Sequence, residues 1–242
     1  MKKIVAIVLG LVLLGTGLYF AWSRRGAGNE YARYLPQDAV ATLNLIDLNQ
    51  VTDTFASTAL GQFLAKDTMH AVIGEMGGTA RDLAEYDRMF DSVAEVMTNR
   101  AFRAVFGEDV AVALLPPEPG DLQATSPETL RASLVVVART NVAGALDLFS
   151  RMIKNANISR VVVDELELTK VVIDSRQVLY GYTEGQMVFL AYSPAAIKQC
   201  LLAADRDGHR LEGKESFAQA VALWQTVAQE KTHARLFVDP PG

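Results

Sequence analysis

The chain has 242 residues, half of them apolar, and a formal net charge of −5. Four of its 23 Lys and Arg residues flank an N-terminal apolar run, which leaves 19 against 28 acids and a net charge of about −9 for residues 26–242. This acidic balance argues against a nucleic-acid partner and against flat binding to anionic lipid. The single cysteine, Cys200, excludes an internal disulfide, so the domain has to rely on its apolar core.

The first 25 residues predict a membrane-inserting segment. Residues 4–22 carry no charge, and a helix of that length reaches roughly 28 Å, close to a hydrocarbon core of about 30 Å. We expect a transmembrane anchor or uncleaved signal over 1–25, a linker over 26–30, a cytoplasmic N-terminus, and a periplasmic or extracellular domain over 31–242. The alternative is a cleaved signal peptide that leaves a secreted domain.

Four small residues of this segment, Ala6, Gly10, Gly17 and Ala21, fall on one side of a helix. Small side chains let two helices approach closely in lipid, which predicts a contact with a second copy or with another membrane helix. The alternative is that such residues are simply frequent in membrane helices. The lipid bilayer is the expected partner of the segment in either case.

The first elements of the domain alternate between strand and helix. Residues 40–46 show the alternation and branching of a strand. Asp47 is placed to cap a helix over 48–55, and a further helical stretch over 60–72 stops at Gly77-Gly78. These patterns predict one strand followed by two helices at the start of the domain.

Thr79 and Asp82 have the spacing of a capping box, which starts an amphipathic helix over 79–97. Its apolar residues follow in steps of three and four, and residues 102–106 continue the apolar side. We expect this helix to pack on the domain's own sheet, because a coiled coil needs about three to four heptads or more.

The second half is richer in strands. Residues 109–115 and 134–138 read as strands, with a loop to Thr129 between them and a helix capped by Asn141 after them. Four further runs, separated by short polar turns, predict a meander. They cover residues 158–163, 166–173, 177–182 and 187–192.

Ser193-Pro194 has the order of a helix start, a further helix covers 217–224, and a last strand covers 233–238. Together the elements predict an α+β fold: a mostly antiparallel sheet with a four-strand meander, helices packed on one face, and one transmembrane helix before it.

Several segments resemble a family of bacterial envelope proteins known only as a domain of unknown function. They are Tyr34-Leu35-Pro36-Gln37-Asp38-Ala39-Val40, Asp47-Leu48, Thr58-Ala59-Leu60-Gly61, residues 106–114 and residues 185–193. The resemblance implies an N-terminal apolar anchor and a Leu-Pro-x-Asp-Ala lead into the first strand, and it assigns no activity and no site residue. Many members are longer than this chain, so the resemblance leaves open whether a following half is missing after Gly242.

The residues that could carry chemistry do not form a motif. His70, His209 and His233 lie in different elements, and Asp205-Arg206-Asp207-Gly208 has its Gly at the wrong position for a calcium loop. Asp164, Glu165 and Glu167 fall at a predicted hairpin turn, where solvent prevents the burial that paired catalytic carboxylates need. Cys200 reads as a small buried side chain on a helix. We therefore expect no metal, no cofactor and no catalytic residue.

The sequence thus favours a membrane-anchored, non-enzymatic module that binds or organises another component of the cell envelope, or associates with itself. One alternative is an extracytoplasmic hydrolase whose site is assembled from distant loops. Another is a carrier of an apolar ligand. Converging polar groups would favour the hydrolase, a large apolar cavity the carrier, and an exposed apolar patch the binding module.

Overall fold

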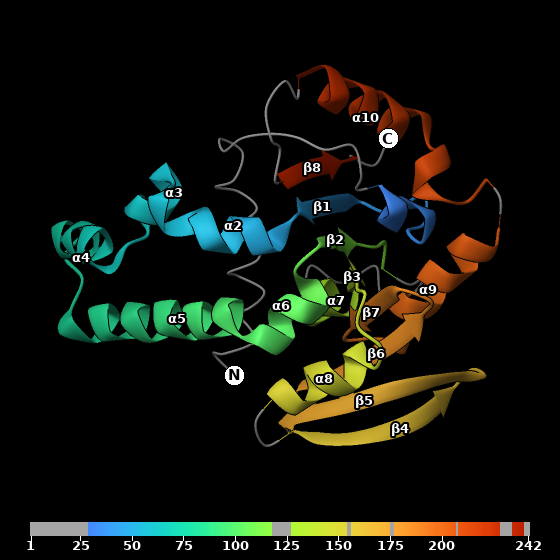
Figure 1. Cartoon of the computed structure of the whole chain (residues 1–242), viewed down its shortest axis with the longest axis horizontal. Coiled ribbons are helices and arrows are strands. Elements are labelled where there is room, and N and C mark those ends of the chain that lie inside the picture. Colours follow the sequence, from blue (N-terminus) through green and yellow to red (C-terminus); the bar gives the residue numbers. More distant parts are fainter. Residues whose placement is uncertain are drawn as a thin grey trace.

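The computed structural model describes residues 29–117, 127–153, 156–174, 177–206, 208–227 and 234–239. Its centre is an eight-stranded sheet with the strand order β4-β5-β6-β7-β3-β2-β1-β8 (Figure 1). Each pairing between neighbouring strands is antiparallel. The strands are β1 (Ala41–Ile46), β2 (Asp109–Leu114), β3 (Leu134–Arg139), β4 (Asn157–Val163), β5 (Leu166–Asp174), β6 (Gln177–Glu184), β7 (Met187–Ala191) and β8 (Ala234–Val238).

Helices connect the strands of the N-terminal half and the last two strands, whereas β4 to β7 form the expected meander. The helices are η2 (Glu30–Arg33), α2 (Leu48–Thr54), η3 (Phe55–Ser57), α3 (Ala59–Phe63), α4 (Lys66–Glu75), α5 (Ala80–Thr98), α6 (Arg100–Phe106), α7 (Pro127–Ala132), α8 (Ala145–Met152), α9 (Pro194–Asp205), η4 (Leu211–Gly213) and α10 (Glu215–Val227). The α+β class is therefore confirmed.

Both faces of the sheet are covered by helices. On the first face, η2, α9 and α10 pack on a core that contains Ala111, Val137 and Phe189. On the second face, α2, α6 and α8 pack on a core that contains Val110 and Ala138. Successive residues of a strand point to opposite faces, so the central strands need apolar residues at nearly every position to supply both cores.

The predicted arrangement of helices on one face only is therefore wrong. The error has a physical reason in β7, whose five residues are all buried. An uninterrupted apolar strand of this kind indicates a sheet covered on both sides, whereas a half-exposed sheet would alternate apolar and polar residues.

The fold-class prediction also placed a transmembrane helix before the domain, and the structure does not support this part either. No helix in the described parts of the chain is both long and apolar enough to cross a membrane. The longest, α5, has 19 residues, but seven of them are charged. The predicted anchor, with Ala6, Gly10, Gly17 and Ala21, lies outside the described residues.

Helices α3, α4 and α5 form an arm that projects from the sheet (Figure 1). No residue of α4 is buried, and in α5 only Met97 is. Polar contacts link the two helices instead: His70 Nε2 lies 2.8 Å from Asp87 Oδ1, and Lys66 Nζ lies 2.7 Å from Asp91 Oδ1. The predicted packing of α5 on the sheet is thus limited to its C-terminal end.

Most of the local helix signals have the predicted structure. Thr79 and Asp82 form the capping box of α5, and the Ser193 side chain caps α9 with Pro194 in its first turn. Asn141 does not cap α8, which begins at Ala145 after Gly144. The Asn141 side chain donates to Glu108 instead, so a long-range hydrogen bond replaces the predicted local one.

Candidate functional site

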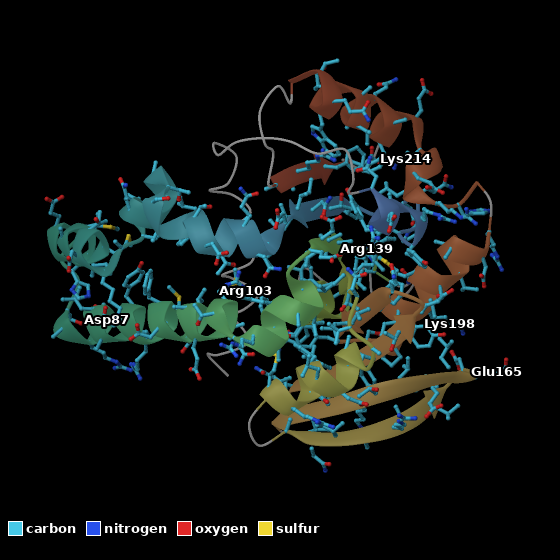
Figure 2. The ribbon with its side chains drawn as sticks, viewed as in Figure 1. Asp87, Arg103, Arg139, Glu165, Lys198 and Lys214 are labelled. Atoms are coloured by element: carbon cyan, nitrogen blue, oxygen red, sulfur yellow. The ribbon has the colours of Figure 1, made fainter. Side chains whose placement is uncertain are left out.

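The acidic residues and histidines singled out in the sequence do not converge. Asp164 and Glu165 form the tight turn between β4 and β5, and Lys198 of α9 contacts Asp164 at 2.7 Å. Figure 2 shows Glu165 and Lys198 at this end of the ribbon, far from Asp87 on the arm. Within the described ranges, no three His, Cys, Asp or Glu side chains are placed to hold a metal ion, and His233 lies outside them.

Cys200 is completely buried on α9, within the core of the first face. Burial raises the pKa of its thiol, because the charged thiolate loses its hydration. The burial agrees with the sequence-based expectation of a small buried side chain, and because the thiolate is the reactive form, we expect Cys200 to be unreactive. Asp205 is the last residue of α9, and Gly208 follows in the left-handed conformation, as expected for a turn after a helix.

Charged residues converge at one end of the sheet, on its first face. This arginine cluster consists of Glu30, Tyr31, Glu108, Asp109, Arg139 and Arg235. Asp109 and Arg139 lie next to the paired residues Val110 and Ala138 of neighbouring strands, and Arg235 of the edge strand β8 pairs with Asn44 of β1, the strand beside β2. Strand register therefore brings together residues that lie more than 100 positions apart.

Burial changes the pKa of three groups in the arginine cluster. It raises the pKa of Tyr31 to about 12 and lowers the pKa of Arg235. Burial also raises the pKa of Asp109, against the lowering effect of the Asp47 backbone N–H and of Arg139. Groups with displaced pKa values gather at functional sites, but structural ion-pair networks displace them too.

The contacts of the arginine cluster identify it as a structural clamp. Arg139 Nη1 lies 3.4 Å from Glu30 Oε2, and its Nε lies 4.0 Å from Glu108 Oε2. The Arg235 guanidinium donates to Asn29 Oδ1 at 3.4 Å and lies 5.7 Å from the centre of the Trp224 ring. Arg139 of β3 and Arg235 of β8 thus connect their strands to residues 29–30 at the start of the described domain. Figure 2 shows Arg139 in the middle of the fold, between the two halves of the sheet.

A second site lies on the opposite face, at the end of the sheet that the helices leave uncovered. Leu236 and Val238 of β8 are 57% and 55% exposed. The alternation along β8 directs both to the second face, because Phe237 between them is buried in the core of the first. We call this site the β8 surface. It consists of Leu236 and Val238, of the half-buried residues of β1 that pair with them, and of the half-buried residues of β2 that pair with those in turn. The β1 and β2 residues are Ala41, Leu43, Val112 and Leu114.

The helices of the second face pack on the other end of the same strands. Leu45 and Val110 are buried there beneath α2 and α6. Two residues along β1, Leu43 is only half buried, and its neighbour Leu236 is exposed. The apolar row therefore continues out of the core onto the surface without a break. A continuous apolar patch of this kind is typical of interaction sites, whereas single exposed apolar residues are ordinary.

Helix α10 borders this end of the sheet on the first face. Its buried Phe217 packs edge-on against Phe237, with 5.2 Å between the ring centres. Its outward side chains are almost free of charge, because Glu215 is the only charged residue of the helix. They include Ala218, Gln219, Ala222, Leu223, Gln225 and Thr226. In a chain as acidic as this one, an uncharged exposed helix indicates a surface that contacts another molecule.

Comparisons with protein-family models, curated proteins and solved structures find no match for this chain. The candidate site therefore rests on geometry alone. Sequence reasoning located the last strand but not the β8 surface, since alternation tells which residues share a face and not which strand lies at the edge. The clustering of uncharged residues over 216–227 was the available signal.

Proposed function

We propose that the chain is a non-enzymatic binding module of the cell envelope, which recognises another component through the β8 surface. The observation that carries this proposal is the apolar row that leaves the core at Leu43 and ends in the exposed Leu236 and Val238. Burying apolar surface stabilises a complex by roughly 25 cal/mol per Å², which favours a partner at this position.

The cellular location is part of the proposal. The apolar residues 4–22 and the resemblance of several segments to a bacterial envelope family support a periplasmic or extracellular domain over 31–242 with the N-terminus in the cytoplasm. A reporter that is active only outside the cytoplasm, fused after Gly242, is expected to be active. Activity of a cytoplasm-specific reporter at the same position would contradict this location.

The binding surface can be tested by site-specific photo-crosslinking in native membranes. A photoreactive residue at position 236 is expected to capture a partner. Val162 is the matched control, because it is 73% exposed on the other edge strand of the sheet. Its neighbours Val161 and Val163 pack on the first face, so Val162 points to the same face as Leu236. Equal capture at the two positions would remove the β8 surface from consideration.

One observation favours a hydrolase as the second candidate, namely the displaced pKa values in the arginine cluster. Asp109 would be its acidic residue. Against this reading, the Asp109 carboxyl group already interacts with the Asp47 backbone N–H and with Arg139, which gives it a structural role without a substrate. A hydrolytic activity that survives purification and is lost in an Asp109→Asn variant with unchanged stability would establish the second candidate.

A further inference from the structure

We infer that the partner of the β8 surface is a second copy of this chain, joined by antiparallel pairing of β8 with β8. The inference rests on the proposed function and names its partner. Within the described part of the chain, β8 pairs with β1 on one side and with no strand on the other. An unpaired strand edge is a ready template for another strand, and a two-fold axis allows both copies to use the same edge.

The two edges of the sheet differ in a way that favours this pairing. The opposite edge strand, β4, exposes the apolar Ile158 and Val162, but the charged Arg160 lies between them, and its guanidinium bonds to Glu167 of β5 at 3.0 Å. Charged side chains on an edge are a common protection against strand addition. In β8 the only charged residue is Arg235, whose side chain is turned away to Asn29 and Trp224. The β8 edge therefore lacks the protection that β4 has.

The difference between the edges also selects the symmetry of the contact. Pairing of β8 with β4 of a neighbour would repeat without end and build a fibre, because each copy would keep a free edge. The exposed arginine on β4 opposes that arrangement. Pairing of β8 with itself uses the β8 edge of both copies and closes the assembly as a dimer.

The residue pattern of β8 fits a two-fold axis at Leu236. In that register Leu236 lies opposite Leu236 of the second copy, and Ala234 lies opposite Val238. The exposed apolar side chains of both copies then meet on the second face, and directly opposed side chains are close enough to pack. The first face would place Arg235 opposite Phe237, so no two like charges face each other directly.

Helix α10 makes the same contact electrostatically acceptable. With a net charge of about −9 over residues 26–242, most faces of this chain repel a second copy. The outward side of α10 carries Glu215 at its start and then only uncharged residues, among them Ala218 and Ala222. Two α10 helices on the same side of a joined sheet can therefore approach without like-charge repulsion.

The size of the contact sets the expected strength. One short strand edge and one helix side from each copy bury on the order of 1,000 Å² in total, the lower limit for a specific interface. A reversible dimer with a dissociation constant in the micromolar range, about 10⁻⁶ to 10⁻⁵ M, is consistent with that area.

Cysteine crosslinking of the full chain in native membranes tests the inference. The two-fold axis places the Cβ atoms of the two residues 236 about 5 Å apart, within reach of a disulfide. Leu236→Cys should therefore form a homodimer under mild oxidation, at least tenfold more than the control Val162→Cys. Cys200 adds no background, because it is buried.

Co-capture of two differently tagged full-length copies from detergent extracts gives a second measurement. Leu236→Lys should reduce co-capture about tenfold, and Val162→Lys should leave it unchanged. Near-ultraviolet circular dichroism checks that both variants fold. Equal crosslinking at positions 236 and 162, or undiminished co-capture of Leu236→Lys, would overturn the dimer.

The outcomes separate this inference from the proposed function. If a photoreactive residue at 236 captures a different envelope protein and never a second copy, the binding module stands and the dimer is wrong. If position 236 captures nothing above the level of position 162, both are wrong.

Discussion

Replacing Tyr31 by Phe tests how burial of the arginine cluster couples stability to pH. The Tyr31 ring is almost fully buried between the sheet and α10, and burial raises the pKa of its hydroxyl from 10.0 to about 12. Between these two values the unfolded chain releases the phenol proton while the folded chain keeps it. Stability therefore falls as the pH rises through this window, and the Phe variant lacks that loss.

The magnitude follows from the displaced pKa. One pKa unit corresponds to about 1.4 kcal/mol, so the full window is worth about 2.7 kcal/mol and the part reached at pH 11 about 1.4 kcal/mol. Urea unfolding of both proteins at pH 8 and pH 11 measures it, and the difference at pH 8 serves as the reference. The Tyr31→Phe variant should gain about 1.4 kcal/mol relative to the wild type. A difference that is the same at both pH values would show that the Tyr31 hydroxyl is not buried as described.

Three further predictions concern other parts of the fold. Thr79→Ala removes the side chain that caps α5 and bonds with Asp82. It should speed amide hydrogen exchange in the arm by a factor corresponding to about 1 kcal/mol, while exchange in the sheet stays unchanged. Equal acceleration in the arm and the sheet would contradict an arm that opens independently. Gly181→Ala places a Cβ 2.7 Å from Leu146 Cδ2 and should lower the free energy of unfolding by about 1–3 kcal/mol. The same substitution should cost less when it is made in a Leu146→Ala variant, because the clashing methyl group is then absent. Burial raises the pKa of Asp109, so the folded chain keeps this proton at a pH where the unfolded chain has lost it. The free energy of unfolding therefore falls as the pH rises above about 4. The Asp109→Asn variant should lose this part of the pH dependence, which urea unfolding at acidic pH would detect.

Local signals in the sequence predicted local structure well. The capping box at Thr79 and the Ser193-Pro194 helix start depend on contacts within a few residues, which the sequence displays directly. The same holds for the meander β4–β7, whose tight turns fix the neighbours of each strand. The α+β class could be predicted for this reason.

Long-range pairing could not be predicted in the same way. The contact of β7 with β3, and of β8 with β1, has no local signature, because any apolar strand can pair with any other. The α5 helix shows the same limit. Its apolar stripe predicts burial but does not identify the partner; only its C-terminal end packs on the core of the second face, and the rest contacts α4 through polar pairs. The candidate site depends on such pairings, since the exposure of Leu236 follows from the position of β8 at the edge.

The order of the strands also determines when the sheet can be completed. Leu43 of β1 pairs with Leu236 of β8, so its outer neighbour is synthesised about 190 residues later. At roughly 5–20 residues per second this delay is about 10–40 s, during which β1 can pair only with β2. The growing chain therefore exposes a second open edge that the finished protein does not have. If two nascent chains paired through their β1 edges, each β1 would contact the other chain in place of its own β8. Slow or stalled synthesis before β8 is therefore the stage at which misassembly of this fold is most favoured.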